Sequence, residues 1–201
     1  MKRPQLPITA APMTRGAFLL SGALAAGAAA GPGVGAAFAQ AGAGDDEILN
    51  FALLLERLEA RFYQLGVQRV KGLSGENRRI FTEIRDNESE HVEILVRLIG
   101  QFGATPVAEP RWDWGDAFSS EERFLEVSQL LEDTGVAAYN GAAPKIGSKA
   151  VLAAAGGIVQ VEARHAGLLR HRLERDAAPD AFDEGIDADE VDRRIAPLIR
   201  S

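Results

Sequence analysis

The sequence predicts an all-α protein, a four-helix bundle in which one long connection joins the second helix to the third. Three observations lead to this fold class. Apolar residues recur at helical spacing in four segments, at about 45–70, 74–99, 119–141 and 148–175. The stretch from 103 to 118 lacks periodicity and contains two prolines and two tryptophans. The second and fourth segments each carry one Glu-x-x-His sequence within an apolar stripe.

The first two helices have recognisable ends. Asp45 or Asp46 can cap the start of the first helix, and Gly72 follows its end. Ser74 opens the second helix, whose three-and-four spacing directs Glu88 and His91 toward the core.

The connection at 103–118 determines the topology. At up to about 3.3 Å per residue, it is long enough to span the bundle from end to end. We therefore expect the third helix to run parallel to the second, rather than antiparallel as in a simple up-and-down bundle.

The last two helices follow the same rules. The third helix begins at Ser119 or Ser120, and Ser119 with Glu122 three residues later forms a predicted capping box. The fourth helix runs from about Ser148 to Arg175. Each glycine of the pair Gly156 and Gly157 costs about 1 kcal/mol against alanine, so we expect close approach of a neighbouring helix or, alternatively, a local kink.

An internal repeat relates the two halves. Leu54-Leu55-Glu56 is followed by Tyr63 seven residues after the Glu, and Leu130-Leu131-Glu132 is followed by Tyr139 at the same distance. Each half is therefore one helix pair. Beyond residue 176 the chain is acidic and loop-like, with a short helix expected at about 189–199.

Residues 1–39 are predicted to be a secretory signal peptide. Basic residues precede an Ala/Gly/Leu-rich run that ends in Ala37-Phe38-Ala39, so we expect cleavage after Ala39 and a periplasmic or secreted protein. Residues 14–19 resemble a twin-arginine export motif, except that Gly16 stands where the second arginine belongs. The alternative is an uncleaved membrane anchor. The bundle would then be residues 40–176, and residues 177–201 an extension packed on it.

Composition excludes several function classes. Beyond residue 39 the chain has 19 basic and 29 acidic residues, which argues against a nucleic-acid partner. It has no cysteine, so it cannot hold an iron–sulfur cluster or covalently attached haem. Both methionines lie in the predicted leader.

The strongest functional signal is a set of metal-ligating residue types. Residues three apart on a helix share one face, so each Glu-x-x-His can bind one ion. A further Glu lies about 30 residues upstream of each pair. Two Glu and two Glu-x-x-His pairs are the ligand set of di-iron and di-manganese carboxylate bundles. Surface salt bridges are the alternative, although these residues lie on the apolar stripes. The candidate ligands are Glu56, Glu88, His91, Glu132, Glu162 and His165.

These residues, the stretch 53–63 and the tail from Phe182 to Ile199 together resemble the ferritin-like superfamily, and more closely its exported, desiccation-associated members. The resemblance covers about residues 45–199. It implies that Glu56, Glu88 and His91 bind one metal ion. It implies that Glu132, Glu162 and His165 bind a second, with Glu88 and Glu162 free to bridge. Glu59 is the alternative to Glu56. The missing methionine argues against a haem-binding bacterioferritin.

Two iron or manganese ions are therefore the expected cofactors, with dioxygen or peroxide as partners of a ferroxidase, peroxidase or catalase. Tyr63 and Tyr139 are candidate catalytic residues because each lies one heptad from a proposed ligand; the alternative is an ordinary core tyrosine. Two other functions stay open: a non-catalytic stress-protective protein with structural metal, and an interaction bundle with an empty site. Whether the chain forms a homo-oligomer stays open at this point.

Overall fold

The computed structural model describes residues 44–199, and the predicted leader lies outside them. This part of the chain is helical, and its only β-type pairing is one isolated bridge. The long helices are α2 (Asp45–Arg69), α3 (Gly75–Gln101), α4 (Glu121–Ala142) and α5 (Lys149–Arg172). Shorter elements follow α4 and α5: η2 (Ala143–Lys145), α6 (Ala188–Ile195) and η3 (Ala196–Leu198).

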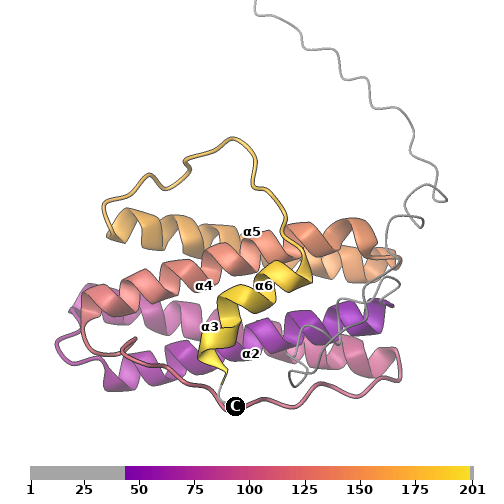
Figure 1. Ribbon diagram of the computed structural model, residues 1–201, viewed down its shortest axis with the longest axis horizontal. Coiled ribbons are helices and arrows are strands. Elements are labelled where there is room, and N and C mark those ends of the chain that lie inside the picture. Colours follow the sequence, from indigo (N-terminus) through magenta and orange to yellow (C-terminus); the bar gives the residue numbers. More distant parts are fainter. Residues whose placement is uncertain (1–43, 200–201) are drawn as a thin grey trace, which may run out of the picture. The chain divides into compact units, whose positions relative to one another are not determined.

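The four long helices form the predicted bundle. α2 packs along α3 and α4 packs along α5, the two pairs meet mainly through α2 and α4, and α3 approaches α5 at few positions. Figure 1 shows the connection between α3 and α4 running the length of the bundle, so that α4 is parallel to α3. The predicted fold class is confirmed.

The connection between α3 and α4 is fastened to the outer side of α2. The Arg57 side chain donates to the backbone carbonyl of Val107, whose own N–H donates to Asn50 Oδ1 at 2.6 Å. Arg61 pairs with Glu109 at 2.9 Å. These contacts cover one face of α2 along several helical turns.

The C-terminal segment packs on the bundle and on this connection. Val191 and Ile195 of α6 are buried in the same core cluster as residues of α2 and α4. Ile199 forms the isolated antiparallel bridge with Trp112. The approach of this segment to α4 requires glycine at position 141, because a Cβ there would lie 1.8 Å from the Ile186 carbonyl oxygen.

Two predicted helix caps are wrong in an informative way. α2 begins after Gly44 without a side-chain cap, and the Asp45 carboxylate instead accepts from the backbone N–H of Gly147 at 2.8 Å and of Ser148 at 2.7 Å, just before α5. The cap of α4 is Ser120, not Ser119, since its hydroxyl accepts from the Arg123 N–H. Asp45 therefore ties the start of the first helix to the start of the last long one.

Gly156 and Gly157 do not mediate close helix packing, so that prediction is wrong. A Cβ at either position would meet no atom within 4 Å apart from its own helix backbone and chain neighbours. Gly157 instead lines a groove between α3 and α5. Within residues 44–199, no helix combines the length and apolarity needed to cross a bilayer.

Candidate metal centre

The six predicted ligands lie together in the middle of the bundle and are all buried. Glu56 comes from α2 and Glu132 from α4, while α3 and α5 each supply one Glu-x-x-His pair. The four carboxylates are completely buried, and the two imidazoles are 6% and 5% exposed. Each side chain occupies an inward position of an amphipathic helix, so the apolar pattern that builds the core also brings these groups together.

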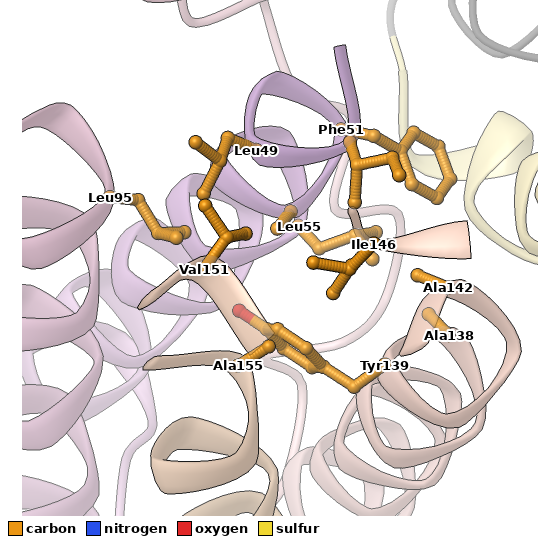
Figure 2. Close-up of a pocket in the computed structure, with 12 residues that line it drawn as sticks. Leu49, Phe51, Leu55, Leu95, Ala138, Tyr139, Ala142, Ile146, Val151 and Ala155 are labelled. Carbon is orange, nitrogen blue, oxygen red and sulfur yellow. The ribbon is translucent and has the colours of Figure 1, made fainter. Parts of the chain in front are cut away.

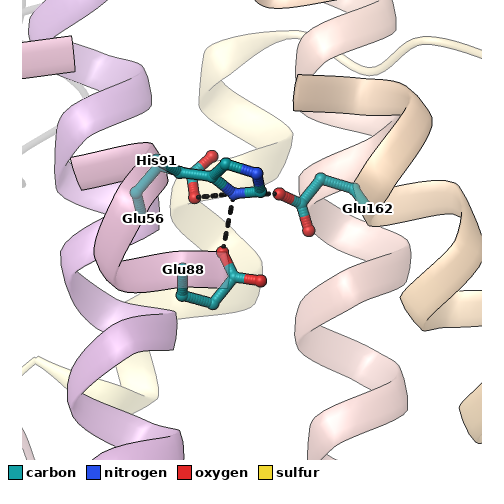
Figure 3. Close-up of side chains that lie close together, drawn as sticks. All are labelled: Glu56, Glu88, His91 and Glu162. Atoms are coloured by element: carbon teal, nitrogen blue, oxygen red, sulfur yellow. Dashed lines mark hydrogen bonds and ion pairs between the residues drawn. The ribbon is translucent and has the colours of Figure 1, made fainter. Parts of the chain in front are cut away.

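One group of candidate ligands surrounds His91. Its Nδ1 lies 3.2 Å from Glu56 Oε2, 3.1 Å from Glu88 Oε2 and 2.9 Å from Glu162 Oε1. In Figure 3 all three interactions meet at one ring nitrogen. Three helices thus direct carboxylate oxygens at a single point.

The second group surrounds His165 in the same manner. Its Nδ1 lies 3.0 Å from Glu88 Oε1, 3.3 Å from Glu132 Oε2 and 3.5 Å from Glu162 Oε2. Within each group, one candidate ligand atom of every residue lies within 4.8 Å of the others. Glu88 and Glu162 belong to both groups and present one oxygen to each histidine.

This arrangement fits cations better than it fits hydrogen bonds. One imidazole N–H can be directed at only one acceptor, yet three carboxylates approach each Nδ1. Glu88 Oε1 and both oxygens of Glu162 are close enough for ion pairs but accept no aligned hydrogen bond from the described residues. Unpaired buried carboxylate oxygens are costly, and metal ions are among the partners that remove this cost. Oxygen and imidazole ligands suit iron or manganese.

Without metal the centre holds protons instead. Burial raises the pKa of Glu88 to about 7, against the opposing effect of the nearby histidines. Burial and the negative charge of Glu162 raise the pKa of Glu132 to about 8. Burial lowers the pKa of His91, but the surrounding carboxylates outweigh it and raise the pKa to about 12; the same balance raises the pKa of His165 to about 12. Protons therefore compete with metal for this centre.

The two tyrosines reach across the bundle to the opposite half. The Tyr63 hydroxyl donates to Glu132 Oε1 at 2.5 Å, and the Tyr139 hydroxyl donates to Glu56 Oε1 at 2.6 Å. Burial, followed by the charge of the bonded carboxylate, raises the pKa of both phenols well above 10. Each phenol therefore stays protonated and fixes the orientation of one carboxylate.

Glu59, the predicted alternative to Glu56, lies outside both groups. It is buried one turn beyond Glu56, and burial together with the charges of the four central carboxylates raises its pKa well above 4.5. It faces Gly135, where an added Cβ would lie 3.4 Å from Glu59 Oε1. The glycine leaves room for the carboxyl group.

The centre opens to solvent through the groove between α3 and α5. This groove, about 510 Å³ in volume, is lined by both histidines and by Asn87, Glu90, Val161 and Arg164, among others. The Asn87 amide lies 3.1 Å from His165 Nε2. Asn87 was not among the residues predicted from the sequence. The available signal was its position directly before Glu88.

A second cavity is too small and too apolar for a substrate. Its volume is about 20 Å³, close to that of a single water site. Figure 2 shows the Tyr139 ring on its wall, among aliphatic side chains that include Leu49, Leu95 and Val151.

A helical bundle with one long crossover and a central cluster of four carboxylates and two histidines defines the class of ferritin-like proteins. The chain belongs to this family, since the family model for the ferritin-like domain matches residues 44–175. No curated protein shows significant similarity to the chain.

Proposed function

We propose that the protein binds two iron or manganese ions between its four long helices and is an exported oxidoreductase that acts on dioxygen or peroxide. The observation that carries this proposal is the sharing of Glu88 and Glu162 between the two ligand groups. Two carboxylates common to both groups are what a pair of adjacent metal ions requires. Export is inferred from the basic and then apolar residues 1–39 alone.

The charges of the ligands support this proposal. Four carboxylates and two neutral imidazoles carry four negative charges, which two divalent cations balance. Bound iron or manganese would supply a change between divalent and trivalent states, the chemistry of a ferroxidase, a peroxidase or a catalase.

The chain's own residues orient the ligands and exclude water from the ends of the centre. Tyr63 and Tyr139 hold the outer oxygens of Glu132 and Glu56, so that their other oxygens face the histidines. Aromatic and aliphatic core residues close the two ends of the centre. The groove between α3 and α5 leaves an approach wide enough for a small molecule. These features favour a reaction with a small oxidant over one with a bulky organic substrate.

Metal content is the first test. We would measure it by elemental analysis of protein beginning at Gln40, beside a Glu88→Ala/Glu162→Ala variant. We expect about two iron or manganese ions per chain, lost in the double variant. Glu90→Ala is the matched control, because Glu90 is a carboxylate on the same helix that lines the groove outside both ligand groups. Full metal content in the double variant would overturn the proposed ligands.

The limited exposure of the two histidines favours a second candidate, a stress-protective protein whose metal is structural and does not turn over. Oxygen and peroxide electrodes separate the two functions. Loss of oxygen or peroxide on addition of ferrous or manganous ions, absent in the double variant, supports the oxidoreductase. A metal-loaded protein that is stabilised but consumes neither supports the structural role.

A further inference from the structure

The two ligand groups are related by the internal repeat, but the residues beside their histidines differ. Aligning Glu88 with Glu162 places Asn87 of α3 opposite Val161 of α5 in the repeat, and both side chains line the groove. The amide nitrogen of Asn87, Nδ2, lies 3.1 Å from His165 Nε2. No side chain within residues 44–199 makes a hydrogen bond to His91 Nε2. One histidine is therefore held on both sides and the other on one side only.

We infer that Asn87 makes the two metal positions unequal, so that the ion bound by His165 is held more tightly than the ion bound by His91. The inference rests on the proposed function, because it assumes that both groups bind metal. Asn87 would be a positioning residue, which acts on the metal through the His165 ring.

The chemistry of a neutral imidazole explains the effect. When Nδ1 binds a metal ion, the ring proton lies on Nε2, which then needs an acceptor. Rotation of the Asn87 amide by 180° exchanges its nitrogen and oxygen, atoms of similar size, and presents Oδ1 to that N–H. Such a partner fixes the ring and makes its other nitrogen a better ligand, typically by 10-fold to 100-fold in metal affinity.

His91 has only solvent in the groove to serve this purpose. A water molecule can accept from its Nε2, but it does not fix the ring as a side chain on a rigid helix does. Val161, which corresponds to Asn87 in the repeat, offers no acceptor to the His91 Nε2–H. We therefore expect His165 to bind metal first and His91 to bind the ion that exchanges more readily.

Histidine NMR during a titration with Zn²⁺ tests this order. The chain has three histidines, so ¹⁵N-histidine labelling gives few ring signals, and His91→Gln, His165→Gln and His171→Gln variants assign them. We expect the His165 ring to respond at a Zn²⁺ concentration about 10-fold or more below that needed for His91. Asn87→Val should raise the Zn²⁺ concentration needed for the His165 signal and so remove most of the difference between the two histidines. Val161→Asn should lower the Zn²⁺ concentration needed for the His91 signal and so reduce that difference.

Two further variants distinguish the proposed role from a general loss of structure. Asn87→Asp keeps an acceptor for Nε2 and should preserve the order of binding. Ser89→Val places a β-branched residue at an exposed position of the same helix, outside the groove, and should change neither response.

Two outcomes overturn the inference alone, and a third overturns the proposed function with it. If His91 and His165 respond together in the unaltered protein, or if Asn87→Val leaves both responses unchanged, the two positions are not set apart by Asn87. Those results would leave the proposed dinuclear centre standing. If neither ring responds at any Zn²⁺ concentration, both the inference and the proposed function are wrong.

Discussion

The helix pairs α2–α3 and α4–α5 carry the same ligand pattern in different surroundings. Leu54 and Leu130 occupy matching positions of the repeat, yet Leu54 is fully buried and Leu130 is 50% exposed. The connection fastened to Asn50, Arg57 and Arg61 covers this side of α2, whereas Leu130 on α4 has no such cover. The two halves thus present the same types of metal ligand and a tyrosine each to the centre, while their outer sides are covered differently. The repeat therefore indicates which residues serve the centre, but not how deeply their neighbours are buried.

The largest expected effect is on metal content, and it follows from removing the upstream glutamate of either half. Glu56→Ala and Glu132→Ala should each reduce bound metal from about two ions per chain to about one, because each removes a ligand from one group only. Elemental analysis after dialysis measures the result. Retention of two ions by either variant would mean that its glutamate is not a ligand.

The pH dependence of stability in the metal-free protein reports on the centre as a whole. Burial raises the pKa of Glu88 to about 7 and of Glu132 to about 8, so from about pH 4.5 to 8 the folded chain binds more protons than the unfolded chain. The free energy of unfolding should therefore fall as the pH rises through this range. The histidines add to the fall above about pH 6.5, since their pKa is raised to about 12.

Calorimetry at pH 5 and pH 8, with chelator and with Mn²⁺, measures this dependence. We expect the metal-free protein to melt roughly 5 °C or more lower at pH 8, because about 1 kcal/mol shifts the midpoint of a chain of this size by about 2–4 °C. Bound Mn²⁺ should remove or reverse the difference. A metal-free protein that is more stable at pH 8 would contradict the raised carboxyl pKa values.

The crossed tyrosines give a finer comparison of the halves. Tyr63→Phe and Tyr139→Phe each leave a buried carboxylate oxygen without its donor, at a cost of about 1–3 kcal/mol. Tyr63 is fully buried and Tyr139 is 7% exposed beside a small cavity, so we expect the larger loss for Tyr63→Phe. Urea unfolding of the metal-free variants measures both. Equal losses of unfolding free energy in the two variants would mean that no water molecule replaces the Tyr139 hydroxyl as the donor to Glu56.

The smallest effect is expected at Glu59, which has glycine as its counterpart in the other half. Its pKa is raised well above 4.5 by burial and by neighbouring carboxylates, so a neutral amide of the same shape replaces it with little change. Glu59→Gln should keep about two metal ions and alter the free energy of unfolding by less than about 1 kcal/mol at pH 5. Loss of one ion would assign Glu59, rather than Glu56, as the ligand.

The sequence predicted what depends on spacing within one helix. The four long helices and the inward direction of Glu88, His91, Glu162 and His165 follow from a three-and-four pattern, which is local. The start of the second helix at Ser74 was predicted as well and is confirmed, since the Ser74 hydroxyl accepts from the Asn77 N–H at the helix start.

Contacts between elements distant in sequence could not be predicted in this way. The pairing of Tyr63 with Glu132 and of Asp45 with the start of α5 depends on the register between helices, which no single-helix pattern contains. The same limit explains the error at Gly156 and Gly157. Two glycines permit a close neighbour, but only the packing of α3 against α5 determines whether one is there.

The bridge between Trp112 and Ile199 has a practical consequence for fluorescence measurements. Both tryptophans of the chain, Trp112 and Trp114, lie in the connection that this bridge joins to the C-terminal segment. Intrinsic fluorescence excited at the indole band therefore reports on the docking of residues 188–199 through Trp112, in addition to the contact of Trp114 with Phe62 of α2. A spectral change after truncation or tagging of the C-terminus would signal undocking of this segment, even while the four long helices stay folded.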